Sequence, residues 1–248
     1  MQDGSPTEPT RDGLPPMPAG PPHEERHFAQ DSTVRDLATG AAEGLVLPFA
    51  LTAALAGIGA PGAIVVTAGL AGLGAGALAL GLGTWLAART DADHYAVERR
   101  REEEESHVYP DREKWEVAAI LHRYGVRGDV LRQAVDQIAS DRKKWVDFMM
   151  RFELDLSEPD PHRAGRGALV STVAFIAGGM IPLLPYMALG NTGQSLLLSC
   201  AATGAALLGF GWLRARGAGL PAVPGGMQAV AVGAAAAFAA YLAASLIG

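Results

Sequence analysis

Apolar residues dominate three long stretches of this chain, at 44–88, 167–213 and 217–248, and none of these stretches contains Asp, Glu, Lys or Arg. One helical crossing of a bilayer needs about 20 apolar residues, so each of the first two stretches is long enough to cross twice. The alternative is a buried helix pair in a soluble protein. It is disfavoured because soluble core helices keep a polar face. The pattern therefore predicts an integral membrane protein.

Gly and Pro divide the first two stretches into hairpins, because these residues interrupt helices. The third stretch supplies one more helix, preceded by a loop at 217–226 that contains Pro221 and Pro224. The predicted fold class is an all-α integral membrane protein with five transmembrane helices. The expected helices lie at about 37–58, 62–88, 167–188, 194–213 and 225–247.

The positions of the basic residues predict the orientation of the chain. With five crossings, Arg35, the basic residues of 89–166, Arg214 and Arg216 all fall on one side of the membrane. The turns on the other side carry no Lys or Arg. Basic loops stay in the cytosol. We therefore expect a cytosolic N-terminus and a lumenal or external C-terminus.

The polar block between the second and third membrane helices is expected to be structured. A helix at 91–108 continues the second membrane helix, and further helices follow at about 111–124 and 128–154, the last interrupted near Ser140 and Asp141. We predict a three-helix cytosolic metal-binding domain here. The predicted division is a disordered tail at 1–30, transmembrane helices at 31–90, the cytosolic domain at 91–162 and transmembrane helices at 163–248.

Carboxylates and thioethers recur at helical spacing in this block. Pairs three residues apart share a helix face, where like charges repel unless a cation binds between them. Carboxylate oxygens suit Fe²⁺ and Mn²⁺, and a thioether adds preference for softer ions. Helical bundles build dinuclear metal sites in this way. The alternative is a solvated acidic face over a Met-lined core. The candidate ligands are Glu102, Glu105, Glu113, Glu116, Met149, Met150 and Glu153.

Glu43 is the last charged residue before 45 apolar positions, and Asp36 lies seven residues earlier. Ionisable groups at membrane depth are costly and usually functional. Pro48 is expected to kink the same helix and act as a hinge. We predict that Glu43 and Asp36 lie on a transport pathway. The alternative is that Glu43 sits at the level of the lipid headgroups, since its depth depends on where the helix begins.

Composition excludes several classes of function. The net charge of −6 leaves no footprint for nucleic acid. The single cysteine, Cys200, excludes an intrachain disulfide. No nucleophile–base set is apparent, and we predict that the protein is not an enzyme.

Several segments resemble the vacuolar iron transporter family. The likeness runs from about residue 27 to the C-terminus. The matching segments are EGLVLPFA (43–50), GLGTWLAA (81–88), DHYA (93–96), EVAAIL (116–121), DFMMRFEL (147–154), PDP (159–161) and GGMIPLLPY (178–186).

The resemblance implies a dimeric exchanger of Fe²⁺ and Mn²⁺ for protons, with the seven candidate ligands as its cytosolic metal site. It also implies that a helix-one aspartate is Glu43 here, a helix-two glutamate is Gly72 and a helix-two methionine is Leu80. The cytosolic set is therefore complete, while the membrane set is reduced.

Three hypotheses follow: a metal/proton exchanger, a metal-binding sensor that no longer transports, and a transporter with altered ion preference. The expected partners are divalent metal ions, protons, membrane lipid and a second copy of the chain. No cofactor is expected; Fe²⁺ and Mn²⁺ are substrates, and Zn²⁺ or Co²⁺ are also expected to fit the cytosolic site. The expected location is a vacuolar membrane in a eukaryote or the plasma membrane in a bacterium.

Overall fold

The computed structural model describes residues 32–189 and 191–247, and the predicted tail at 1–30 lies outside them. All regular structure in the described residues is α-helical. The helices are α1 (Ser32–Gly57), α2 (Gly62–Val108), α3 (Pro110–Arg123), α4 (Gly128–Ala139), α5 (Arg142–Phe152), α6 (Arg163–Ala188), α7 (Thr192–Gly217) and α8 (Ala222–Ile247).

Five of these helices, α1, α2, α6, α7 and α8, are long and apolar enough to cross a membrane, as predicted. The predicted lead-in loop at 217–226 is partly wrong, since α8 begins at Ala222 and contains Pro224 in its first turn. A proline in the first turn breaks no intrahelical hydrogen bond, so Pro224 is compatible with a helix start. Pro110 likewise begins α3.

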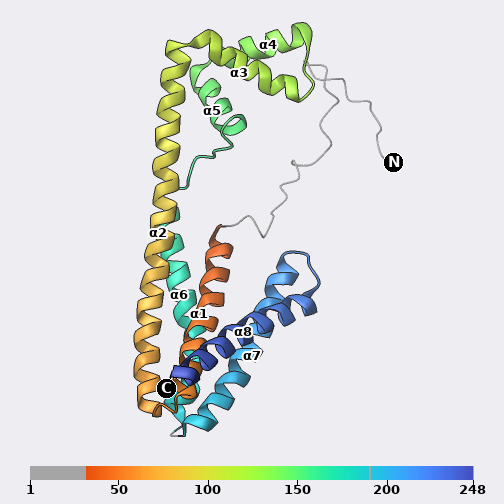
Figure 1. The fold of residues 1–248 in the computed structure, drawn as a ribbon. Helices are drawn as coiled ribbons and strands as arrows, with labels where there is room; N and C mark the ends of the chain where they lie inside the picture. Colours follow the sequence, from red (N-terminus) through yellow and green to blue (C-terminus); the bar gives the residue numbers. More distant parts are fainter. Residues whose placement is uncertain (1–31, 190, 248) are drawn as a thin grey trace, which may run out of the picture.

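The second helix is much longer than a bilayer needs. Its 47 residues give a length of about 70 Å, whereas a hydrocarbon core is about 30 Å thick. Its apolar part ends near residue 88, and the charged part at 89–108 continues past that apolar, membrane-length segment. Figure 1 shows α3, α4 and α5 gathered around this far end, beyond the ends of the other long helices.

Small residues allow α1 and α6 to pack backbone against backbone. A β-carbon at Gly44 would overlap the carbonyl oxygen of Phe175, and one at Gly178 would lie 2.9 Å from the carbonyl oxygen of Ala41. Such close approach is typical of membrane helices, which gain little from burying apolar surface against each other and depend on tight contact.

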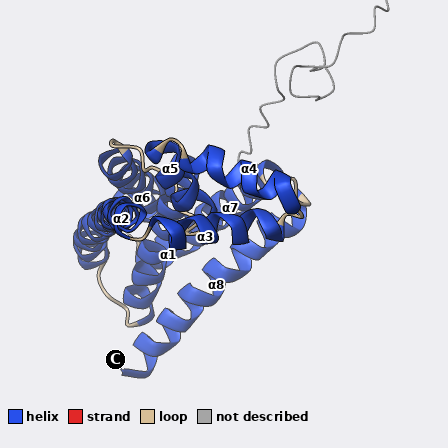
Figure 2. Ribbon diagram, turned by 90° about the horizontal axis from the view of Figure 1, so that it is seen from above, coloured by secondary structure: helices blue, strands red, loops and turns tan. Residues whose placement is uncertain are grey.

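The last helix crosses the bundle diagonally (Figure 2). Near its N-terminal end it packs on α7, where a β-carbon at Gly225 would lie 2.9 Å from the carbonyl oxygen of Gly211. Near its C-terminal end it packs on α1, where a β-carbon at Gly57 would lie 3.0 Å from the ring of Tyr241. Cavities remain beside this crossing, between α8 and its two neighbours.

Candidate metal centre

Three helices bring the acidic residues of the polar block together. Glu102 and Glu105 lie on the projecting part of α2, and α3 turns back after Tyr109 with Glu113 in its first turn. The third element, α5, is started by Asp141, whose carboxylate accepts hydrogen bonds from the backbone nitrogens of Lys143 at 3.0 Å and Lys144 at 3.3 Å. This cap lowers the pKa of Asp141 and fixes the start of the helix that carries the two methionines.

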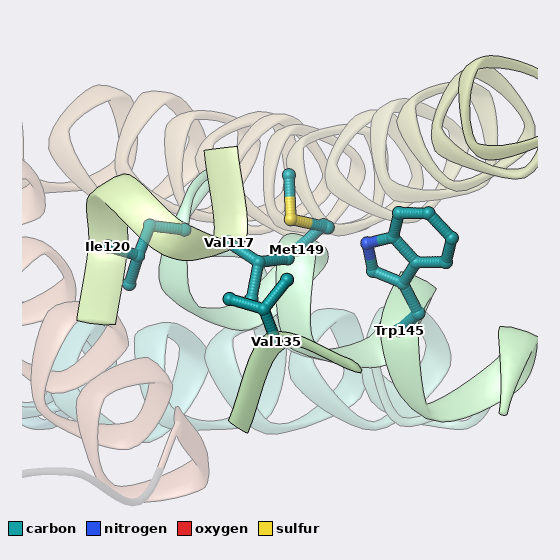
Figure 3. Close-up of a cluster of buried hydrophobic side chains, with 5 residues drawn as sticks. All are labelled: Val117, Ile120, Val135, Trp145 and Met149. Atoms are coloured by element: carbon teal, nitrogen blue, oxygen red, sulfur yellow. The ribbon is translucent and has the colours of Figure 1, made fainter. Parts of the chain in front are cut away.

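The core of this region is a small apolar cluster between α3, α4 and α5. It consists of Val117, Ile120, Val135, Trp145 and Met149. Figure 3 shows Met149 between Val117 and Ile120 on one side and Trp145 on the other. Met149 is only 1% exposed. The structure thus gives Met149 a packing role, and its role as a metal ligand stays a prediction.

Two of the predicted ligands are carboxylates buried in the protein. Glu102 is 3% exposed and Glu113 is 1% exposed. Burial is the main cause that raises the pKa of each to about 7. Neighbouring carboxylates add to the shift: Glu153 acts most strongly on Glu102, and Glu116 on Glu113. The pKa of Glu153 is raised for the same two reasons, burial first and then repulsion by Glu116. The five glutamates therefore form one electrostatic group.

Several oxygens of this group have no hydrogen-bond partner. Both carboxylate oxygens of Glu113 and Oε2 of Glu102 are buried and unsatisfied. An unsatisfied buried polar atom typically costs about 1–3 kcal/mol, and more when it is charged. A proton or a bound cation at these oxygens would remove that cost.

Two arginines already lie at the edge of the group. Arg101 lies 3.9 Å from an oxygen of Glu102 and of Glu105, and Arg112 lies 3.2 Å from Glu116 and 3.8 Å from Glu105. Neither arginine reaches Glu113 within ion-pair distance. The sequence-based prediction did not include these arginines, although their spacing of four residues from Glu105 and Glu116 could have indicated them.

As the side chains are placed, no three acidic, histidine or cysteine groups of the described residues converge closely enough to share one ion. The carboxylates are gathered on neighbouring faces, with two arginines at the edge of the group. Metal binding therefore requires rotation of glutamate side chains and displacement of the guanidinium groups. Glutamate side chains can make such rotations within their common rotamers.

Within the membrane domain, Glu43 faces a cavity of about 410 Å³ lined by α1, α7 and α8. Glu43 is exposed and forms no ion pair with another residue of 32–189 or 191–247. The resemblance to the family implies two further pathway positions on α2, and both are apolar here. Leu80 packs against a buried apolar cluster that includes Phe175 and Leu183. A β-carbon at Gly72 would lie 2.8 Å from the side chain of Leu51. Pro48 is buried inside α1, which stays helical on both sides of it.

Asp36, the other predicted pathway residue, is held in an ion pair. Arg163 at the start of α6 donates to both carboxylate oxygens of Asp36, at 2.7 and 3.0 Å. Asp36 is 7% exposed, and a β-carbon at Gly167 would lie 2.7 Å from it, so the pair fills its site. This contact joins residues 127 positions apart, and helical spacing could not have revealed it. A pathway role for Asp36 stays a prediction.

These features define a multi-pass helical membrane protein with an acidic, partly buried candidate cation site at the end of its longest helix. The sequence profile of the VIT family matches residues 34–245. The chain belongs to the VIT family, which confirms the resemblance noted in the sequence.

Relatives match nearly the whole chain. Vacuolar iron transporter 1 of Oryza sativa subsp. japonica is 43% identical over 219 residues, covering 88% of this chain and 87% of the rice protein. Vacuolar iron transporter 1 of Arabidopsis thaliana is 40% identical over 225 residues, covering 91% and 90%. Protein CCC1 of Saccharomyces cerevisiae is 30% identical over 223 residues, covering 87% and 69%.

Proposed function

We propose that this protein transports divalent metal, Fe²⁺ and/or Mn²⁺, from the cytosol into a vacuole or lumen, or out of the cell, in exchange for protons. The names of its relatives support iron transport into vacuoles. The observation that carries the proposal is the pair of buried carboxyls, Glu102 and Glu113, with unsatisfied oxygens and pKa values near 7. They lie at the projecting end of a membrane-spanning helix.

Capture of metal by this cluster would release protons. A carboxyl whose pKa is about 7 is half protonated at neutral pH, so a dication that binds it displaces a proton. The thioether of Met150, which is 2% exposed on the helix that faces α2, would add a softer ligand. The remaining glutamates would supply the other oxygen ligands.

Within the membrane, Glu43 is the proposed acceptor of the released ion. Among the described residues, it is the only acidic side chain that lines the cavity between α1, α7 and α8. Pro48 lies five residues further along α1. In the proposed transport step, α1 rocks about Pro48 and carries Glu43 between the two sides. Asp36, held by Arg163, would anchor the cytosolic end of that helix.

The proposal includes a homodimer with cytosolic N-termini and lumenal or external C-termini. Glu43 and Leu47 are both exposed on α1, and Leu47 is 53% exposed. A carboxylate that faces lipid would be costly. Pairing of α1 with its copy would cover this face and place two Glu43 carboxylates along one pathway. The orientation follows the distribution of basic residues argued above.

A metal-binding sensor or buffer that does not transport is the second candidate. The surroundings of Gly72 and Leu80 favour it, because both positions are apolar and packed in the structure. A dimer would then offer two pathway carboxylates and no pathway thioether. Hard dications bind weakly when few carboxylates replace their water shell.

The test is uptake of Mn²⁺ and Fe²⁺ into proteoliposomes that contain the purified protein, with an imposed pH gradient. Uptake that rises with the gradient supports the exchanger. Metal binding without any uptake supports the sensor.

We further predict that Glu43→Gln abolishes flux while binding of Mn²⁺ by the cytosolic cluster is unchanged. Glu104→Gln is the matched control, because Glu104 is exposed and forms no ion pair. Full flux in the Glu43 variant would remove this residue from the mechanism.

A further inference from the structure

The segment that joins the candidate metal centre to the membrane domain is short and stiff. This linker runs from Glu153 at the end of α5 to Arg163 at the start of α6 (Figure 1). Pro159 and Pro161 lie within it, and proline fixes its own φ. Two prolines in so short a segment leave little slack, so a displacement of α5 is passed on to α6.

Hydrogen bonds fix both ends of the linker. At the α5 end, the backbone nitrogen of Leu156 donates to the carbonyl oxygen of Met150 at 2.8 Å. At the α6 end, the carbonyl oxygen of Asp160 accepts from the backbone nitrogen of Arg163 at 2.9 Å. The carboxylate of Asp160 also lies 3.1 Å from the guanidinium of Arg166. Each end of the linker is therefore held to its own helix and moves with it.

Arg163 also holds the N-terminal end of α1, the helix that carries Glu43. Its guanidinium donates to both carboxylate oxygens of Asp36. A β-carbon at Gly167, one turn further along α6, would overlap this guanidinium. The pair is closely enclosed, so a chain of contacts leads from the metal centre through the linker and Arg163 to α1.

The linker starts at two of the predicted metal ligands. Met150 and Glu153 lie at the C-terminal end of α5, whereas Glu102 lies on α2 and Glu113 on α3. As the side chains are placed, the acidic groups of the described residues do not converge on one ion. An ion held by all three helices would therefore draw the end of α5 toward α2 and α3 and pull on the linker.

We propose that the Asp36–Arg163 ion pair is a latch on α1, which metal binding at the candidate metal centre opens through the linker. The latch rests on the metal capture of the proposed function and adds a control to it. With the centre empty, α1 stays held at its N-terminal end. With an ion bound, Arg163 is drawn away from Asp36, and α1 is free to rock about Pro48. Glu43 then moves only after an ion has been captured, which prevents protons from crossing without exchange for metal.

Thermodynamic linkage fixes the sign of the effect on affinity. Metal can open the latch only if it binds more tightly when the latch is open, and a closed latch then lowers metal affinity by the same factor. A change that uncouples the latch from the centre should therefore raise the affinity for Mn²⁺, by about fivefold or more for a coupling of typical size.

The test is hydrogen exchange of the full-length protein in detergent, with and without Mn²⁺, measured by mass spectrometry for peptides from the first three turns of α1. Calorimetry on the same samples gives the affinity for Mn²⁺. In the wild type, Mn²⁺ is expected to speed exchange in these turns by about fivefold or more. Neither measurement depends on transport.

Two variants uncouple the latch in opposite ways. Arg163→Gln leaves it open, so exchange in α1 is expected to be fast with and without Mn²⁺. Two glycines inserted between Glu158 and Pro159 slacken the linker, so exchange is expected to stay slow in both conditions. Both variants should bind Mn²⁺ more tightly than the wild type by about fivefold or more, and the insertion does so without any change of charge. Two glycines inserted after Gly125, between α3 and α4, are the matched control and should behave as the wild type does.

The outcomes separate the latch from the exchanger. Mn²⁺ that binds the wild type without changing exchange in α1 would refute the latch and leave the exchanger in place. A wild-type response in the protein with the lengthened linker would refute the latch too, since the ion pair would then be only structural. A wild type that binds no Mn²⁺ would refute both the latch and the proposed capture of metal.

Discussion

Lowering the pH from 8 to 6 should sharply weaken metal binding by the acidic cluster. Glu102 and Glu113 have pKa values of about 7 in the folded protein. Each is about 90% ionised at pH 8 and about 10% ionised at pH 6. If the ion needs both carboxylates, the fraction with both ionised falls about 100-fold between these pH values, which corresponds to about 2.7 kcal/mol of binding free energy.

The assay is equilibrium binding of Mn²⁺ to the full-length protein in detergent, measured by calorimetry at pH 6, 7 and 8. Glu113→Gln removes one of the two titrating carboxyls. The affinity of this variant for Mn²⁺ is therefore expected to fall only about tenfold between pH 8 and pH 6. Glu104→Gln should behave as the wild type, because Glu104 is exposed. A wild-type affinity that changes less than about twofold between pH 6 and 8 would refute the reasoning, since groups with ordinary pKa values stay ionised over this range.

The same shifts predict the sign of a stability effect without metal. The folded-state pKa values lie above the ordinary value of 4.5, so the folded protein binds more protons than the unfolded chain between about pH 4.5 and 7. This contribution to stability is fully present below pH 4.5 and is lost as the pH rises through 7. Added Mn²⁺ is expected to restore thermal stability at pH 8 and to have little effect at pH 5. The midpoint of thermal unfolding in detergent, measured at pH 5 and pH 8 with and without Mn²⁺, tests the pH effect and the metal effect.

Three further predictions test individual contacts. Arg112→Gln should raise the affinity of the acidic cluster for Mn²⁺ by up to about tenfold at low salt, because the guanidinium of Arg112 then no longer repels the ion. Arg123→Gln, at an exposed position of the same helix, should leave the affinity unchanged, and calorimetry compares the two variants. Asp36→Asn should lower stability by about 1–3 kcal/mol, since it leaves Arg163, whose side chain is 27% exposed, without its counter-ion; an unchanged midpoint of thermal unfolding would contradict this. Gly44→Ala should destabilise the protein by about 1–3 kcal/mol through overlap with the neighbouring helix, whereas Gly74→Ala, where the added methyl meets open space, should be neutral or stabilising.

The sequence predicts the helices well because the energetic cost of charge in a bilayer is large and local. Charged residues are rare in membrane spans because of this cost, so long charge-free stretches mark most of each crossing, and Glu43 within α1 is the kind of exception that points to a function. The structure begins α8 at Ala222, earlier than the predicted residue 225, because the first turn of a helix tolerates Pro224. The two glutamate pairs with a spacing of three residues, Glu102/Glu105 and Glu113/Glu116, do lie on helices, α2 and α3, and the four carboxylates are close enough to interact.

Contacts between distant segments could not be predicted. Asp36 and Glu43 share a helix face, yet one is buried against Arg163 and the other opens to a cavity. The difference comes from the positions of α6 and α8, which no local pattern encodes. Met149 shows the same limit: the sequence could not indicate that it packs with apolar side chains of α3, α4 and α5, and its predicted role as a ligand stays a prediction.

The two candidate sites differ in how they can balance the charge of an ion. The acidic cluster has five carboxylates and two arginines. A dication that binds there can replace protons and displace guanidinium groups, so the net charge of the site stays low in every state. The membrane cavity has one carboxylate and one arginine. A dication beside Glu43 would therefore leave the cavity with a net positive charge, and an anionic group paired with Arg214, such as a lipid phosphate, would reduce that charge. Transport in proteoliposomes should therefore depend on headgroup composition more strongly than binding of metal by the acidic cluster does.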